Sequence, residues 1–193
     1  MPALAWRMLR SPVTLAELRD LFASGQLRNG AGLELVAGVV LASPPPRAAV
    51  VAVVTELAAT LDRELPDHRV MVREAVALGE RDLLRPEVGL VRPVWEAGPA
   101  WRATGGGIPA AALALAVFVG DHEAPLRWRA HRCARAGVPE AWTVAVGEGT
   151  ASRWRRPWEG RYRAREALPP GETVELDAAP DRPLIAWRPA GAV

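Results

Sequence analysis

The chain has 193 residues, of which 50% are hydrophobic and 24% charged, with a formal net charge of +2. This length and apolar content suit one soluble domain with a full hydrophobic core and exclude a disordered or fibrous chain. All 24 basic residues are arginines, so chemistry that needs a lysine amine, such as Schiff-base formation or a lysine-containing phosphate-binding loop, is excluded.

The N-terminal segment predicts a helix followed by a hairpin. Thr14 and Glu17 form a capping box before an amphipathic run that ends near Gly25. Residues 33–42 contain two β-rich runs around the pair Ala37-Gly38, which is typical of a tight β-hairpin.

The middle of the chain predicts one long helix and three strands. Residues 47–65 are almost continuously apolar and predict a helix that is buried on most faces against a sheet. Strands are expected at residues 68–74, 75–78 and 87–92. Residues 93–109, rich in Gly and Pro, predict a long loop.

The second half alternates strands with one helix. An apolar strand at residues 110–119 leads to a helix at 124–136, which Gly137 closes in a position typical of a C-cap. Another strand is expected at 140–146 and an Arg- and Trp-rich hairpin over 150–167, followed by one or two edge segments near the C-terminus.

This order of elements predicts an α/β (α+β) fold with a central mixed sheet and a helix on each face, in a single domain over residues 1–193. The single Cys133 excludes an intrachain disulfide, and no signal peptide or membrane-spanning run is recognisable. A cytoplasmic location without a membrane role is therefore expected.

Two carboxylates are candidate metal ligands. Glu34 lies within the first strand of the hairpin, and Glu87 follows Pro86 at the start of an apolar strand. Facing each other across neighbouring strands, they would offer the oxygen ligands that Mg²⁺ prefers. The alternative for Glu34 is an ordinary strand residue that faces solvent.

Several segments resemble the Uma-type putative restriction endonuclease family of the PD-(D/E)XK nuclease superfamily. The resemblance spans about residues 14–187, and its most specific segments are RPEVGLVR and ARAGVPEAW; it includes TLAEL, LELVAG and SPPPRAAVV as well. The resemblance implies a restriction-endonuclease-like fold, a Mg²⁺ cofactor and DNA as the substrate.

Carried over by position, the family's site is incomplete in this chain. Glu34 matches the acid of the first hairpin, and Glu87 matches the Asp of the "PD" strand. The next acid should lie in residues 110–119, which contain only Ala, Leu, Val and Phe, and the family's Lys falls on Arg129. Two of four roles are thus missing, and we expect a member whose catalysis is weak or lost, with Mg²⁺ as its cofactor or none.

Other activities stay open at this point. A nuclease with a rearranged site would need a displaced acid, for which Asp121, His122 and Glu123 offer candidates after the apolar strand. A scaffold or homodimer is another possibility, with an interface or a core built from tryptophans at positions 95, 101, 142 and 187. The three histidines lack the paired spacing of metal ligands.

The Arg-rich hairpin is a candidate nucleic-acid surface. Guanidinium groups pair with phosphates, and the interleaved Trp154, Trp158 and Tyr162 offer flat faces for stacking of bases. The alternative is that the arginines only solvate a sheet face and cover the aromatic rings. The candidate DNA-binding residues are Arg153, Arg155, Arg156, Arg161, Arg163 and Arg165.

Overall fold

A computed structural model describes residues 12–27, 32–93, 107–185 and 187. The chain divides into two compact units, each of which is considered by itself. Unit 1 comprises Met1–Pro44, Ala75–Arg85 and Ala97–Pro109, and unit 2 comprises Pro45–Glu74, Pro86–Glu96 and Ala110–Val193. The single domain expected over residues 1–193 stays a prediction.

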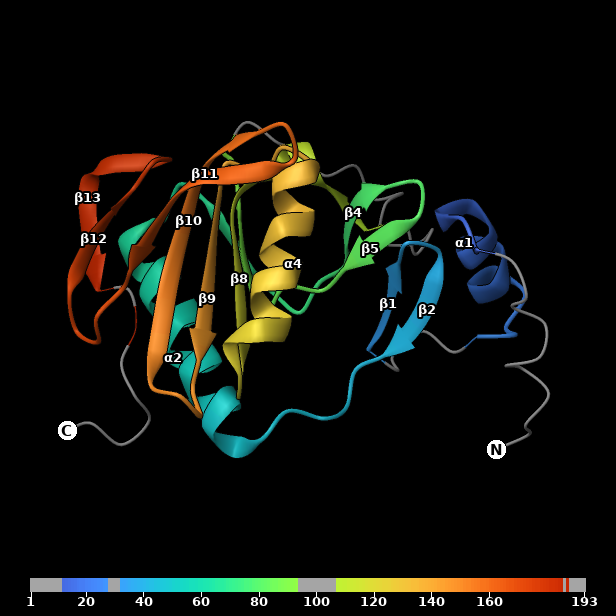
Figure 1. Ribbon diagram of the computed structural model, residues 1–193, viewed down its shortest axis with the longest axis horizontal. Helices are drawn as coiled ribbons and strands as arrows, with labels where there is room; N and C mark the ends of the chain where they lie inside the picture. The colour runs from blue at the N-terminus through green and yellow to red at the C-terminus, as the bar shows by residue number, and fades with distance from the viewer. Residues whose placement is uncertain (1–11, 28–31, 94–106, 186, 188–193) are drawn as a thin grey trace. The chain divides into compact units, whose positions relative to one another are not determined.

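In its described residues, unit 1 contains one helix and a five-stranded sheet of order β2-β1-β5-β4-β7 (Figure 1). Its apolar centre is formed by the helix, one face of the hairpin and β5, with Leu18, Leu35 and Leu83 fully or almost fully buried. The elements are α1 (Leu15–Ala23), β1 (Leu33–Val36), β2 (Val39–Ala42), β4 (Val76–Gly79), β5 (Asp82–Leu84) and β7 (Ile108–Pro109).

Local signals explain why these elements begin and end where they do. The capping box is confirmed, because the Thr14 hydroxyl accepts from the Glu17 N–H while the Glu17 carboxylate accepts from the Thr14 N–H. In the hairpin turn, Ala37 and Gly38 both have positive φ values, of 49° and 81°, as a two-residue turn between twisted strands requires.

Unit 2 contains a six-stranded mixed sheet of order β11-β10-β9-β8-β6-β3 and a separate two-stranded β12-β13 sheet. The connection from β8 through α4 to β9 makes the one parallel pair of this sheet. The elements are α2 (Ala48–Glu64), β3 (Arg69–Val72), β6 (Val88–Val91), the 3₁₀ turn Ala110–Ala112, β8 (Leu113–Gly120), α4 (Glu123–Arg135), β9 (Glu140–Ala145), β10 (Thr150–Trp158), β11 (Arg161–Ala167), β12 (Thr173–Leu176) and β13 (Ala179–Ile185).

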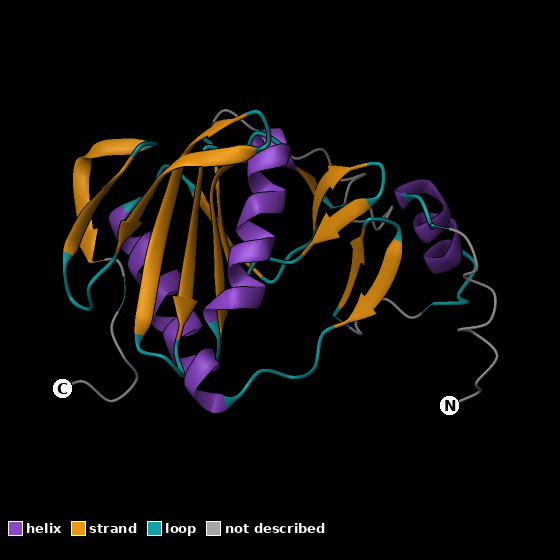
Figure 2. Ribbon diagram, viewed as in Figure 1, coloured by secondary structure: helices purple, strands orange, loops and turns teal. Residues whose placement is uncertain are grey.

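The six-stranded sheet lies between two helices. In the view of Figure 2, α4 covers the near face of the sheet and α2 covers the far face. Gly137 closes α4 with a positive φ of 77°, as the sequence predicts. The fold class is therefore confirmed as mixed α and β, with helices on both faces of a mixed sheet.

The strand β8 is buried along its length because it receives cover from both helices. Every residue from Leu113 to Val119 is at most 4% exposed. Leu115, Val117 and Val119 pack in the cluster that includes α2, so Phe118 points to the opposite face, toward α4. A strand in this position has no contact with water on either side, which accounts for its purely apolar composition.

Three expectations about the fold need correction. The helix α2 buries only one stripe, which includes Val53, Leu57 and Leu61, while Val51 is 45% exposed; a continuous apolar run therefore overstated its burial. The strand β5 was not expected, because its three residues resemble part of a turn. The hairpin β1-β2 and strands β4 and β5 form a sheet of their own rather than joining one central sheet.

A buried ion pair joins β9 and β10 to the C-terminal hairpin. Glu140 is 1% and Arg153 6% exposed. The Glu140 Oε1 accepts from the Arg153 Nε at 2.6 Å and from the Trp142 Nε1 at 2.6 Å. Its other oxygen accepts from Arg153 at 3.1 Å and from the Asp177 backbone N–H at 3.2 Å. These four hydrogen bonds compensate the carboxylate for its loss of water.

No helix in the described part of the chain combines the length and the apolar content needed to cross a lipid bilayer.

Gly38→Ala should destabilise the protein by at least about 2 kcal/mol, since it adds left-handed backbone strain and a steric clash. A Cβ atom at this position would lie 2.6 Å from the Pro12 Cβ and 2.9 Å from its Cα. Gly25 is the matched control, because its φ is also positive but nothing lies within 4 Å of an added Cβ. Urea unfolding compares the two variants; equal losses would contradict the role of Pro12.

Glu140→Gln should cost about 3 kcal/mol of stability, because it leaves Arg153 buried without its principal counter-charge. The control is Glu64→Gln in the exposed Arg63–Glu64 pair, where the loss should stay within about 0.5 kcal/mol. Thermal and urea unfolding measure both. A Glu140→Gln variant as stable as the Glu64→Gln variant would show that the buried pair contributes little.

Candidate functional site

Glu87 lies at the start of β6 in unit 2, directly after Pro86. Its Oε2 accepts a hydrogen bond from the Val119 backbone N–H at 3.1 Å, which fixes the carboxylate beside the end of β8. The β6–β8 register pairs Val88 with Val117, so Glu87 lies next to Phe118 across the two strands. The predicted "PD" position therefore holds a partly buried acid with a defined orientation.

Arg129 of α4 faces this acid. Its Nη1 lies 3.6 Å from the Glu87 Oε1, and the two side chains are only 18% and 13% exposed. The same guanidinium lies over the Phe118 ring, 5.8 Å from its centroid. The structure thus brings together two of the predicted site residues, Glu87 and Arg129. The Phe118 ring of β8 lies beside the Arg129 guanidinium.

Glu34 occupies a different environment in unit 1. It is 3% exposed, so it does not face solvent, and its Oε1 accepts from the Arg85 backbone N–H at 2.8 Å. The expectation that Glu34 and Glu87 lie on neighbouring strands is wrong, since β1 and β6 belong to different sheets. The reason is that β1 pairs with β5, the strand that the sequence did not predict.

The fit to Mg²⁺ can be judged from the oxygen atoms in unit 2. A hard divalent cation needs several oxygen ligands, whereas the cluster around Glu87 supplies one carboxylate that already faces a backbone N–H and a guanidinium. Among the described residues, no three side chains of His, Cys, Asp or Glu come together as a metal site. These residues do not fit the family's Mg²⁺ site.

The three residues after β8, which were candidates for a displaced ligand, each contact a polar partner. Asp121 pairs with Arg47 at 3.2 Å, the His122 Nδ1 lies 3.2 Å from the Glu148 Oε1, and Glu123 accepts from Arg165. These contacts hold the three side chains in place. A rearranged metal site built on them has no third ligand in the described part of the chain.

Two of the six hairpin arginines, Arg153 and Arg155, each pair with more than one acid. Arg153 is buried in the Glu140 pair, and Arg155 binds Glu166 and, at 3.0 Å, Asp177. Burial of the Arg155 side chain lowers its pKa, but the hydrogen bond to Glu166 outweighs this effect and raises the pKa. Both arginines are therefore held in ion pairs within unit 2.

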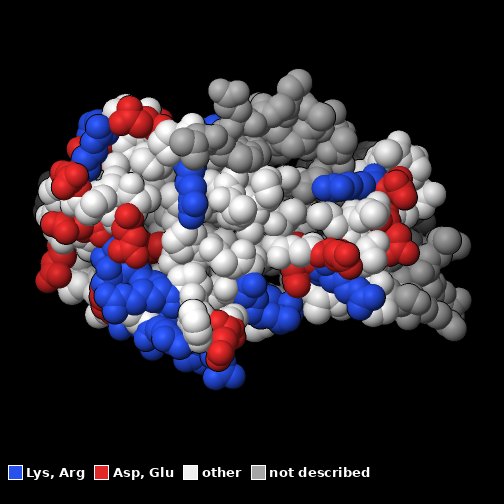
Figure 3. Space-filling model, turned by 90° about the horizontal axis from the view of Figure 1, so that it is seen from above, with Lys and Arg blue, Asp and Glu red and all other residues white. Residues whose placement is uncertain are grey.

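The remaining hairpin arginines lie at the surface. Arg163 stacks over the Trp158 ring at 4.5 Å, and Arg165 over the Trp154 ring at 4.9 Å, as the alternative interpretation expects. Arg165 also binds Glu123. Figure 3 shows the largest group of basic side chains at the lower left of the view, with smaller groups elsewhere on the same face. The nucleic-acid role of the six arginines stays a prediction.

The remaining candidates are mostly structural. Cys133 is buried, which raises its pKa to about 12 and leaves the thiol protonated and inert. Trp142 and Trp187 belong to the core, at 0% and 4% exposure, so they do not line a homodimer interface. Trp95 and Trp101 lie outside the described residues.

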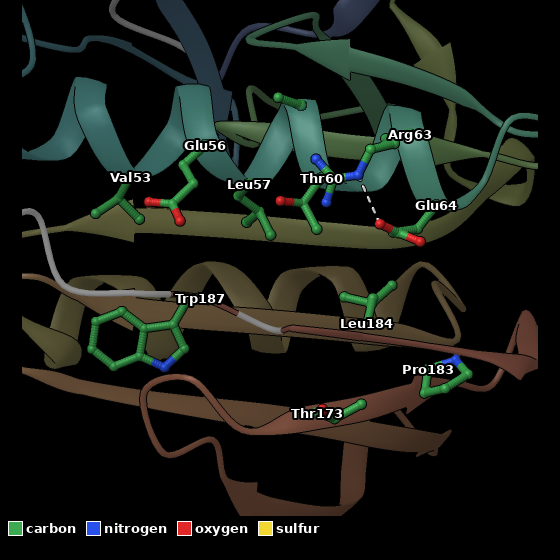
Figure 4. A pocket seen from close by; sticks show the side chains of 11 residues that line it. Val53, Glu56, Leu57, Thr60, Arg63, Glu64, Thr173, Pro183, Leu184 and Trp187 are labelled. Carbon is green, nitrogen blue, oxygen red and sulfur yellow. Dashed lines mark hydrogen bonds and ion pairs between the residues drawn. The ribbon is translucent and has the colours of Figure 1, made fainter. Parts of the chain in front are cut away.

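A groove of about 360 Å³ lies between α2 and the β12-β13 hairpin (Figure 4). Val53, Leu57 and Leu184 give it an apolar floor. Its Arg63 pairs with Glu64 at 2.8 Å, so these two charges satisfy each other. Its lining also includes Glu56, Thr60 and Thr173, but among the described residues no three side chains of His, Cys, Asp or Glu come together there as a metal site.

Sequence reasoning missed one important acid, Glu140. It lies in the segment ARAGVPEAW, whose pattern suggested a recognisable motif but no role for its carboxylate. An acid within a strand flanked by apolar residues was the available signal, because a buried carboxylate requires a cationic partner. The spacing of the two residues in the sequence does not identify this partner. Arg153 comes close to Glu140 only through the pairing of β9 with β10, in which Arg153 lies opposite Trp142.

Comparisons with known proteins give matches for both the family and the fold. The model of the Uma2 family, described as putative restriction endonuclease, matches residues 16–184. A solved structure, a putative nuclease belonging to DUF820 from Anabaena variabilis ATCC 29413, shares the fold with a TM-score of 0.68 and 16% sequence identity, covering 91% of this chain and 96% of that one. A search of curated proteins gives no match. The match over most of the chain, together with the acid at the start of β6, places this protein in the Uma2 family of putative restriction endonucleases.

Proposed function

We propose that this chain is a restriction-endonuclease-like protein in which metal-dependent cleavage is weak or lost. The observation that carries the proposal is the surrounding of Glu87 within unit 2, where its carboxylate lies 3.6 Å from Arg129 and the Arg129 guanidinium lies over the Phe118 ring. The β6–β8 register supports Phe118 as the residue that fills the place of the missing acid. In this arrangement the acid serves as the partner of a cation within the protein.

The chemistry of phosphodiester cleavage supports the same conclusion. A Mg²⁺-dependent nuclease needs carboxylates that hold the metal and a group that accepts the proton of the attacking water. Arg129 stays protonated and cannot accept a proton, and Phe118 offers no ligand. Losses of this kind each reduce the rate by about two to three orders of magnitude.

A second role, nucleic-acid binding without cleavage, is supported by the balance of charges. Within the described residues, five arginines around α4 and β11 have no carboxylate partner, whereas Arg153 and Arg155 are paired with carboxylates. Uncompensated guanidinium groups favour a polyanion. The unpaired residues are Arg127, Arg135, Arg156, Arg161 and Arg163.

Incubation of the purified protein with plasmid DNA and Mg²⁺ or Mn²⁺ tests the proposed loss of cleavage. We expect no nicking above the level of a Glu87→Ala variant, because the remaining carboxylate supplies too few ligands. Gel electrophoresis of the plasmid forms is the measurement. Cleavage by the wild type that disappears in Glu87→Ala would instead establish an active nuclease with a rearranged site.

Nucleic-acid binding should weaken steeply with salt if the unpaired arginines contact phosphates. A fluorescence anisotropy titration with a labelled DNA duplex measures the dissociation constant over a range of NaCl concentrations, and each phosphate contact contributes about 0.9 to the slope of log K against log salt. Arg161→Ala together with Arg163→Ala should lower this slope by about 2. The matched control is Arg47→Ala together with Arg63→Ala, which removes the same charge from partnered sites; an equal effect would contradict the proposal.

A further inference from the structure

An open cleft of about 560 Å³ lies on unit 2 between the outer face of α4 and the β10-β11 hairpin. Whereas α4 directs Arg129 toward the sheet, it directs Arg127, Trp128 and His131 into this cleft. The hairpin contributes Trp154 and Arg165. The cleft is thus separate from the Glu87 cluster, although both use the same helix.

Aromatic rings give the cleft flat walls. Trp128 is 40% exposed, which is unusual for so large an apolar side chain. Arg132 covers part of its ring at 5.0 Å. On the other side, the Trp154 ring packs edge-on against His131 with centroids 5.3 Å apart, and its Nε1 donates to Thr143, which fixes this wall. An exposed tryptophan beside a fixed wall offers a stacking surface to a planar group.

Positive charge surrounds the rings. Burial lowers the pKa of His131, and the nearby guanidinium groups of Arg127 and Arg161 lower it further, so the imidazole stays neutral while the arginines carry the charge. In the described part of the chain no carboxylate pairs with either arginine. Glu123 compensates Arg165 alone. A ligand of this cleft should therefore combine a flat apolar ring with negative charge.

We propose that the cleft binds an unpaired nucleotide of a nucleic-acid strand, with the base stacked on Trp128 and the flanking phosphates paired with Arg127 and Arg161. The inference rests on the nucleic-acid binding proposed above and adds its location and the form of the strand. An unpaired base is required, because only its π-face is free to stack on an aromatic side chain. Guanidinium groups supply the forked donors that phosphates accept.

Anisotropy titration of a labelled oligo(dT) of about 15 nucleotides tests this site. Trp128→Ala should weaken binding about tenfold, and Trp128→Phe should recover most of the loss because it retains a stacking face. Arg127→Ala should weaken binding severalfold and lower the salt slope by about 0.7. The controls are Val51→Ala, an exposed apolar residue that does not line the cleft, and Arg63→Ala, both on α2, and both should stay within about twofold. Circular dichroism verifies that each variant is folded.

The outcomes separate the cleft from nucleic-acid binding in general. Oligo(dT) binding that Trp128→Ala leaves unchanged, or that Val51→Ala reduces equally, would overturn the cleft and leave the nucleic-acid role intact. Absence of binding to both oligo(dT) and duplex at low salt would overturn both proposals. Thymidine monophosphate that competes at the same concentration of nucleotide units would overturn the requirement for a strand and indicate a free nucleotide instead.

Discussion

Burial of β8 on both faces is the constraint on which the larger unit depends. This strand lies inside the six-stranded sheet, with α2 packed against one face and α4 against the other. A carboxylate within it would lose its water and require a cation or a metal beside it. In this chain the strand carries none, and beside its end the Glu87 carboxylate lies 3.6 Å from the Arg129 guanidinium. The same apolar composition thus stabilises the core and, in the function proposed above, leaves the family's third acid without a counterpart.

The local features of the fold could be predicted because their causes are local. The capping box at Thr14, the turn at Ala37-Gly38 and the helix end at Gly137 each depend on a few adjacent residues. The burial of α2 could not be predicted in the same way. Its exposed face carries apolar residues such as Val51 and Ala52 beside Thr55 and Glu56, so the apolar run does not by itself show how far burial extends; partners distant in the sequence decide that.

The candidate site was predictable in part for the same reason. Position in a family motif identified Glu87 and Arg129, which the structure brings to within 3.6 Å of each other. Glu34 was expected beside Glu87 because β1 was predicted to lie next to β6. In the structure β1 pairs with β5, a strand of only three residues that was not predicted. The Glu140–Arg153 pair was missed because its partners meet only through the register of β9 and β10. The site could be predicted as far as residue chemistry determines it, but not where it depends on the pairing of strands that are distant in the sequence.

Arginine performs every cationic task in this lysine-free chain. The buried Arg153 forms two hydrogen bonds to the carboxylate of Glu140. At the surface, Arg165 stacks on Trp154 and Arg163 stacks on Trp158. Both uses follow from a planar, weakly hydrated and permanently charged group. The same properties make Arg129 a suitable partner for Glu87 and an unsuitable proton acceptor. The use of arginine in place of lysine throughout the chain thus accounts both for the cations at the surface and for the proposed loss of a proton acceptor at position 129.

A crystal soaked in Mn²⁺ tests the central claim most directly, because the anomalous signal of the metal locates it without reference to activity. We expect Glu87 to keep its contacts with Arg129 and the Val119 N–H, with no anomalous peak at its carboxylate. A Mn²⁺ ion bound to Glu87, with Arg129 displaced and further oxygen ligands completing the coordination, would contradict the account.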